Sequence, residues 1–185
     1  MANRVCPWWL GYLLANPIRR WIQDPDDILH PYVREGMTVL EPGPGMGFFT
    51  LVLARLVGAS GRVIAVDLQP KMIVGLKRRA AKAGLLDRVD ARVSTAETIG
   101  LEDLAGKVDF TLAFAMVHEF PDAGRFFAEV ARASKPGGLL LLAEPQGHVN
   151  DARFEAELSA AAAAQFALAA RPRIRRSHAA LLTKL

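Results

Sequence analysis

Two acidic residues and three glycines stand at spacings that suit a charged, nucleoside-like ligand. An apolar run ends at Glu41, and Gly43, Gly45 and Gly47 follow at every second position. A second apolar run ends at Asp67, twenty residues after the last of these glycines. Glycines let a chain turn sharply from a strand into a helix, and they let a ligand approach the backbone closely. The beginning of the following helix favours a carboxylate or a phosphate.

The spacing of the glycines separates two kinds of ligand. The fingerprint for a nicotinamide dinucleotide is G-x-G-x-x-G, whereas this chain has G-x-G-x-G, and Glu41 comes just before it. A carboxylate at that place repels a pyrophosphate and attracts an ammonium group. An amino acid joined to a nucleoside fits such a site, with its carboxylate at the helix and its ammonium near the acid. Asp67 is placed to accept hydrogen bonds from ribose hydroxyls.

The elements that must position these residues alternate between strands and helices. Near-continuous apolar runs predict buried parallel strands at 37–41, 62–67, 108–115 and 138–143, and a weaker, alternating run predicts another strand at 89–93. Amphipathic stretches predict helices over 46–57, from Pro70 onward, from Pro121 through Val130 and over 151–170. The helix that begins at Pro70 is expected to direct its basic residues outward; these are Lys77, Arg78, Arg79 and Lys82.

This alternation predicts a doubly wound, Rossmann-like α/β fold. The sheet is expected to be mostly parallel, with helices on both faces and an antiparallel C-terminal finish built from strands at 173–176 and 179–185. At 185 residues the chain is long enough for a single domain. We expect that domain to consist of a core over 37–185 and an aromatic and basic segment over 1–36, the N-terminal segment.

Composition narrows the class and the compartment. Hydrophobic residues make up 51% of the chain, which excludes a disordered protein. The formal charge of +4 permits nucleic acid, an anionic membrane or an anionic ligand and selects none of them. No apolar run approaches the roughly 18 residues that span a bilayer, and 5–15 does not have the flanks of a cleaved signal. The single cysteine, Cys6, suits a reducing cytoplasm and is too little for a soft-metal site, so no metal is expected.

Four segments in the expected order resemble the class I S-adenosylmethionine (SAM)-dependent methyltransferases. Residues 41–47 match the first motif of that family, and the strand that ends at Asp67 matches the second. Residues 108–122 are similar to its fourth strand and the following loop, and 135–142 to the next turn and strand. The resemblance covers about residues 36–185 and implies SAM as the cofactor and methyl transfer as the reaction.

The resemblance also implies roles for individual residues in the cofactor site. Glu41 and the three glycines would hold the methionine part of SAM, and Asp67 the ribose. Residues along the adenosine or beside the methionine would be Leu68, Met72, Thr95, Ala96, Ala113 and Phe114. The family commonly has Asp or Asn before this alanine, where it bonds the adenine amino group, whereas this chain has Thr95.

The candidate catalytic residues are His118 and Glu119. They follow the fourth strand, on the loop where the carboxyl ends of the strands meet the ligand. His118 can take a proton from an acceptor hydroxyl or amine, because the ordinary pKa of histidine is about 6.5. The structural alternative for His118 is that it only caps the helix beginning at Pro121. The alternative for Glu119 is that it is an ordinary charged residue exposed to solvent. Few such groups are needed, since alignment of nucleophile and methyl supplies much of the rate.

The candidate substrate-binding residues come from two places. Glu144 and His148 follow the fifth strand at the same rim as His118. Trp8, Trp9 and Tyr12 lie in the N-terminal segment and would offer aromatic surface to an apolar or cationic acceptor. Packing of these aromatic residues onto the sheet is the alternative. The basic pair at 19–20 leaves open a peripheral membrane contact of the same segment.

The leading function is transfer of a methyl group from SAM to a small-molecule acceptor that is a metabolite, quinone-like or lipid-like. An RNA or protein methyltransferase and a non-catalytic SAM-binding module are the alternatives. Enzymes that methylate base amines typically have Asn/Asp-Pro-Pro-aromatic after the fourth strand, whereas residues 113–116 here are Ala-Phe-Ala-Met. We therefore expect no stable complex with nucleic acid. The acceptor atom and the oligomeric state do not follow from the sequence.

Overall fold

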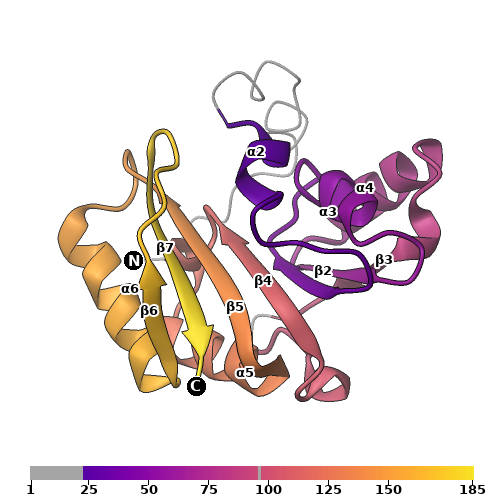
Figure 1. Cartoon of the computed structure of the whole chain (residues 1–185). Helices are drawn as coiled ribbons and strands as arrows, with labels where there is room; N and C mark the ends of the chain where they lie inside the picture. Colours follow the sequence, from indigo (N-terminus) through magenta and orange to yellow (C-terminus); the bar gives the residue numbers. More distant parts are fainter. Residues whose placement is uncertain (1–22, 96) are drawn as a thin grey trace. The chain divides into compact units, whose positions relative to one another are not determined.

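The computed structural model describes residues 23–95 and 97–185 (Figure 1), and these residues form two compact units. The N-terminal unit ends at Glu97, and the C-terminal unit begins at Thr98. Predictions for Trp8, Trp9, Tyr12 and Ala96 fall outside the described residues. In the part of the chain that is described, no helix has the length and apolar character to cross a bilayer.

Three parallel strands form the sheet of the N-terminal unit. Its elements are α2 (Pro25–Leu29), β1 (Thr38–Pro42), α3 (Thr50–Leu56), β2 (Arg62–Asp67), α4 (Pro70–Lys82), a 3-10 turn (Leu86–Arg88) and β3 (Val89–Val93). The strands follow the order β3-β2-β1, with Val63 facing both Val39 and Val89 in register. The predicted strands 62–67 and 89–93 are confirmed, and β1 lies one residue later than predicted.

The helices of this unit begin where the local backbone allows. Pro70 occupies the first turn of α4, where its missing N–H costs nothing. Met72 and Leu76 lie on the buried face of the same helix. The helix predicted from residue 46 begins at Thr50 instead. Gly47 has a φ of +84°, which a right-handed helix cannot accept, so residues 45–49 form turns and the helix starts only after them.

The C-terminal unit contains four strands in the order β4-β5-β7-β6. Its elements are two 3-10 turns (Glu102–Leu104 and Val117–Glu119), β4 (Val108–Phe114), α5 (Ala123–Ala133), β5 (Ser134–Pro145), α6 (Asp151–Ala163), β6 (Phe166–Ala170) and β7 (Ser177–Lys184). β4 and β5 are parallel, and β7 is antiparallel to both β5 and β6. Phe110, Phe127 and Leu141 are completely buried in its core.

Two predictions about the tail were wrong in detail. The alanine-rich helix ends at Ala163 rather than at 170, and the strand predicted at 173–176 lies at Phe166–Ala170. Gln165 has a φ of +66°, which ends the helix, and pairing with β7 then holds the following alanines extended. Partners distant in sequence have here overridden the helix preference of alanine. The predicted antiparallel finish itself is confirmed.

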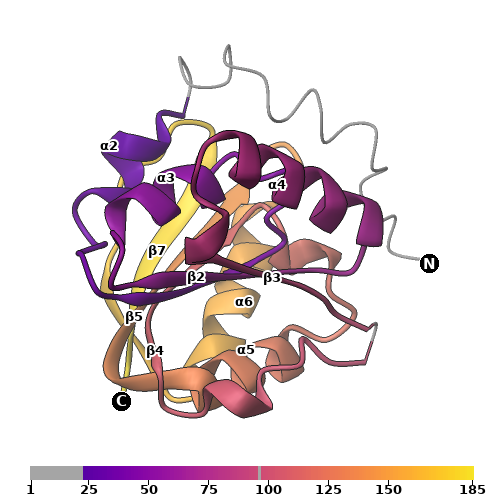
Figure 2. The same cartoon turned by 90° about the vertical axis from the view of Figure 1, so that its right-hand side faces the viewer.

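Helices α5 and α6 lie side by side in the C-terminal unit (Figure 2), and α6 also packs against β6 (Figure 1). Phe154, Glu157 and Ala161 are the buried residues of α6. Spacings of three and four residues place all three on one face of the helix. This packed face therefore includes a carboxylate, which is unusual for an inward position.

Candidate active site

The glycine turn after β1 has the backbone conformation that the sequence predicts. Gly43, Gly45 and Gly47 have φ angles of +67°, +54° and +84°, all in the left-handed region. A Cβ atom on Gly47 would lie 2.4 Å from Leu76 Cδ1, whereas a Cβ on Gly45 would meet nothing within 4 Å. Gly47 therefore serves packing against α4, while Gly45 borders open space that a ligand can enter.

Two predicted acids lie at the carboxyl ends of neighbouring strands. Glu41 of β1 pairs in register with Ala65 of β2, two residues before Asp67, and both carboxylates are at least nine-tenths buried. Asp67 Oδ2 accepts a hydrogen bond from the Gly45 N–H at 3.3 Å, and its Oδ1 accepts one from the Gln69 N–H at 2.8 Å. The second acid therefore also holds the glycine turn.

These residues fit SAM. The turn leaves room beside Gly45 for a ligand to reach main-chain N–H groups, which suit the methionine carboxylate. The negative charge of the Glu41 carboxylate attracts an ammonium group. Asp67 stands one strand away and offers the oxygen atoms that ribose hydroxyls bind.

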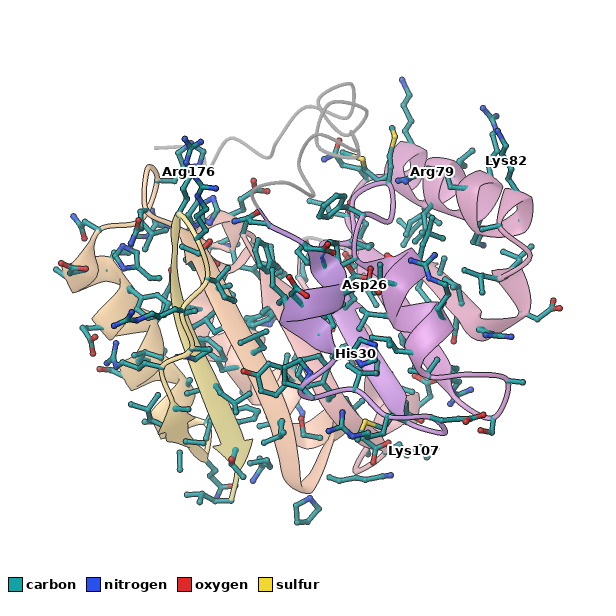
Figure 3. The ribbon with its side chains drawn as sticks, turned by 45° about the horizontal axis from the view of Figure 1, so that its top comes forward. Asp26, His30, Arg79, Lys82, Lys107 and Arg176 are labelled. Carbon is teal, nitrogen blue, oxygen red and sulfur yellow. The ribbon has the colours of Figure 1, made fainter. Side chains whose placement is uncertain are left out.

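Arg79 holds the same turn from the side of α4. Its Nη1 donates a hydrogen bond to the Met46 carbonyl oxygen, and burial lowers the pKa of its guanidinium (Figure 3). The prediction that Arg79 faces outward was therefore wrong. Its long apolar stem lets the charged group reach back across the helix surface to the turn, which a helical pattern alone does not reveal.

The other predicted cofactor residues differ in exposure. Leu68 is 42% exposed at the carboxyl end of β2, whereas Met72 is buried under α4. Thr95 is exposed, and its Oγ1 accepts a hydrogen bond from the Glu97 N–H at 3.2 Å. Ala113 and Phe114, which lie at the end of β4 in the C-terminal unit, are both buried.

The glycine turn yields a prediction that separates binding from packing. Gly45→Ala is expected to cost about 1 kcal/mol of stability through its positive φ and to weaken SAM binding roughly tenfold by filling open space. Gly47→Ala is expected to cost about 3 kcal/mol, because φ is positive there and the new methyl group would overlap the side chain of Leu76, which is fully buried. Urea unfolding and calorimetric titration with SAM measure the two effects. Equal loss of stability in both variants would contradict this division.

In the C-terminal unit, a buried carboxylate organises the loop after β4. Glu144 lies near the end of β5 and is completely buried. Its Oε1 accepts hydrogen bonds from the backbone N–H groups of Met116 at 3.2 Å and Val117 at 2.7 Å. Its Oε2 is hydrogen-bonded to His118 Nδ1. The structure therefore brings together one predicted catalytic residue and one predicted substrate-binding residue, and His118 Nε2 has no hydrogen bond to the residues that are described.

The surroundings of His118 favour its protonated form. Burial by itself would lower the pKa of His118, but the hydrogen bond to Glu144 and the charges of Glu144 and Glu119 outweigh it. The pKa of His118 is consequently raised above its ordinary 6.5. The charge of Arg153 opposes this rise. A histidine held by a buried carboxylate in this way is oriented to accept a proton on its other ring nitrogen.

Backbone strain lies next to this pair. Ala115 has a φ of +56°, an uncommon value for a residue with a side chain, and its N–H donates to the Ala143 carbonyl at 2.7 Å. The bond attaches the end of β4 to β5 just before the turn that carries His118. Strained residues often occur at functional sites, and nothing in the sequence reveals this one.

Helix α6 contributes two residues that the sequence analysis did not select. Arg153 Nη2 donates a hydrogen bond to the His118 carbonyl oxygen at 2.6 Å, and Arg153 Nε lies 3.9 Å from Glu157 Oε1. The other predicted histidine, His148, is exposed, and its ring centre lies 5.7 Å from that of His118. The only signal in the sequence is that Glu157 falls on the face of the helix that Phe154 and Ala161 bury.

Glu157 is a buried acid with an abnormal proton affinity. Burial and the charge of Glu144 raise the pKa of Glu157 to about 7, against the partial opposition of Arg153 and His118. Among the described residues, its Oε2 has no hydrogen-bond partner. Near neutral pH this carboxyl is therefore divided between its charged and uncharged forms.

This proton affinity predicts how stability depends on pH. Between pH 4.5 and about 7 the folded protein keeps a proton on Glu157 that the unfolded chain has released, so stability falls as pH rises through this window. Glu157→Gln removes the burial of a charge and is expected to be more stable than the wild type by roughly 2–3 kcal/mol at pH 8, and about equally stable at pH 4.5. Urea unfolding at both pH values measures the difference. An equal difference at the two pH values would show that Glu157 does not titrate in this way.

Comparison with known proteins agrees with this geometry. Residues 40–142 match the family described as "Methyltransferase domain". The chain is 34% identical over 119 residues to a ubiquinone biosynthesis O-methyltransferase of Methylocella silvestris, covering 64% of this chain and 44% of that protein. It is 29% identical over 112 residues to a ubiquinone/menaquinone biosynthesis C-methyltransferase of Hydrogenovibrio crunogenus, covering 60% and 43%. The chain therefore spans less than half the length of these two relatives.

A solved structure matches almost the whole chain. It is a SAM-dependent methyltransferase of Aquifex aeolicus, with a TM-score of 0.87 and 24% identity, and the match covers 98% of this chain and all of that one. This likeness confirms the predicted doubly wound, Rossmann-like fold, and the predicted cofactor is the one that this neighbour's description names. Since the family match extends over more than half of the residues, the protein belongs to the methyltransferase domain family.

Proposed function

We propose that the protein is an enzyme that transfers a methyl group from SAM to a small-molecule acceptor by in-line displacement. The observation that carries this proposal is the pair formed by His118 and Glu144, a proton acceptor held by a fully buried carboxylate at the ends of β4 and β5. Two relatives are named for steps in quinone biosynthesis, which supports an acceptor that is quinone-like or another metabolite or lipid.

SAM supplies an activated methyl group on a positively charged sulfur. The sulfur–methyl bond breaks as a bond from the methyl to the acceptor atom forms, so the positive charge disappears from sulfur. An acceptor hydroxyl or amine must also lose its proton. In the proposed mechanism His118 Nε2 takes that proton, and Glu144 stabilises the imidazolium ion through Nδ1.

The neighbours of His118 receive secondary roles in this proposal. Glu119 adds negative charge beside the imidazole, which favours its protonated form. His148 is exposed near His118 and would contact the acceptor, and Trp8, Trp9 and Tyr12 would cover it with aromatic surface. Glu144 has its oxygen atoms engaged by the loop, so we assign it to positioning His118 rather than to binding the acceptor.

The test is a turnover assay with SAM carrying a labelled methyl group. The acceptors are a simple catechol, a hydroxylated quinol, a primary amine, total RNA and a denatured protein mixture, each offered separately. Label in the catechol or quinol, with release of S-adenosylhomocysteine, supports the proposal. Label only in RNA or in protein refutes the small-molecule acceptor. Binding of SAM by calorimetry without any transfer would indicate a module that binds the cofactor without catalysis.

A further inference from the structure

Among the residues that the structure describes, Glu157 is a buried acid near His118 that the proposed reaction does not use. Its side chain is 6% exposed, and its Oε2 has no hydrogen-bond partner among the described residues. A buried polar group without a partner costs free energy, so its presence on the packed face of α6 requires a reason. We propose that Glu157 is a positioning residue of the active site, whose charge, together with that of Arg153, controls how firmly His118 holds its proton.

Arg153 provides the physical connection. Its guanidinium donates to the His118 carbonyl oxygen and lies within ion-pair distance of Glu157, so one cation contacts both the histidine loop and the buried acid. The Asn150 side chain accepts a hydrogen bond from the Arg153 N–H and fixes the first turn of α6. The Arg153 side chain is 47% exposed, against 6% for Glu157, so water weakens the charge of Arg153 more than that of the acid.

Few charged groups among the described residues act on Glu157. Besides Arg153 they are Glu144 of β5 and His118 of the loop after β4, while Glu119 of the same loop acts on His118. On β7, His178 bonds the Val149 carbonyl and lies 3.4 Å from Asp151, and β6 has no charged residue. The buried acid of α5, Glu129, is engaged by Thr98 and Ile99.

Burial and the charge of Glu144 place the pKa of Glu157 at about 7, and protonated His118 favours the ionised form of Glu157. By reciprocity, ionised Glu157 favours protonated His118. The acid would therefore gain its charge near neutral pH, and that charge would help His118 to hold a proton. This inference rests on the proposed function, in which His118 takes a proton from the acceptor.

The experiment is an NMR titration of the histidines in the full chain, which has four of them. The His118 signal is identified by its loss in His118→Gln. Glu157→Gln, which fixes the site as neutral, is expected to lower the pKa of His118 by about 0.5 unit. Arg153→Gln is expected to raise it, because the opposing cation is lost. Glu155→Gln is the matched control, since Glu155 lies on the same helix, is exposed and pairs with Arg171, and we expect no shift.

A His118 titration that is the same in Glu157→Gln as in the wild type, or an equal shift in Glu155→Gln, overturns the inference. If Glu157→Gln does not fold, Arg153→Gln decides the matter, and the absence of an upward shift then overturns it. The acid side of the kcat–pH profile should move with the NMR midpoint, and Glu157→Asp should restore part of the shift. The titration needs no turnover, so unchanged methyl transfer in His118→Gln would refute the base role and leave the coupling standing.

Discussion

Replacing His118 by Gln is expected to lower kcat for methyl transfer about 100-fold or more, while the affinity for SAM stays within about twofold. Gln keeps much of the size and polarity of the side chain but cannot accept and hold a proton. The bond from Glu144 would then orient a group without base function. Single-turnover rates with a hydroxyl acceptor and calorimetric titration with SAM measure the two quantities separately.

Two further variants complete this prediction. Glu144→Gln should reduce kcat in the same direction and flatten the pH profile, because a neutral amide no longer favours the imidazolium ion. His30→Gln is the matched control, since His30 is an exposed histidine of the N-terminal unit, and its kcat should equal that of the wild type. A wild-type rate in His118→Gln would remove the proton-acceptor step from the mechanism and leave alignment alone as the source of rate.

Replacing Asp67 by Ala is expected to weaken SAM binding by about 1–3 kcal/mol. The variant loses the acceptor proposed for the ribose hydroxyls and also the bonds from the Gly45 and Gln69 N–H groups, so the glycine turn loses a fixed point. Calorimetric titration with SAM and with S-adenosylhomocysteine measures the change, and both ligands should lose affinity equally because they share the ribose.

The control for this variant is Asp87→Ala, which removes an exposed carboxylate from the same unit. Its affinity for SAM should not change. Asp67→Asn should recover part of the loss, since an amide can still bond one hydroxyl and one N–H. Full affinity in Asp67→Ala would mean that this strand end does not contact the cofactor.

Strong local patterns account for the parts of the fold that the sequence predicts well. β2 and β3 begin and end at the predicted residues because β2 is a nearly continuous apolar run and β3 alternates apolar and polar residues, and both patterns are typical of strands. The three glycines show the predicted turn because only glycine accepts the required backbone angles at low cost. The C-terminal residues 151–185 were harder to predict, because an alanine-rich stretch has no pattern that separates a helix from a strand. Pairing with β7 decides where β6 lies.

By itself the sequence determined the family, the cofactor and the strand ends from which the predicted acids come, because these depend on residue types at short spacings. Only the tertiary structure revealed that Glu144 bonds His118, that Arg79 holds the glycine turn, and that Arg153 and Glu157 border the active-site loop. Each of these contacts joins residues 26–35 positions apart, or depends on how deeply a side chain is buried. Proton affinity follows from burial and neighbouring charge, which arise only when distant segments pack together.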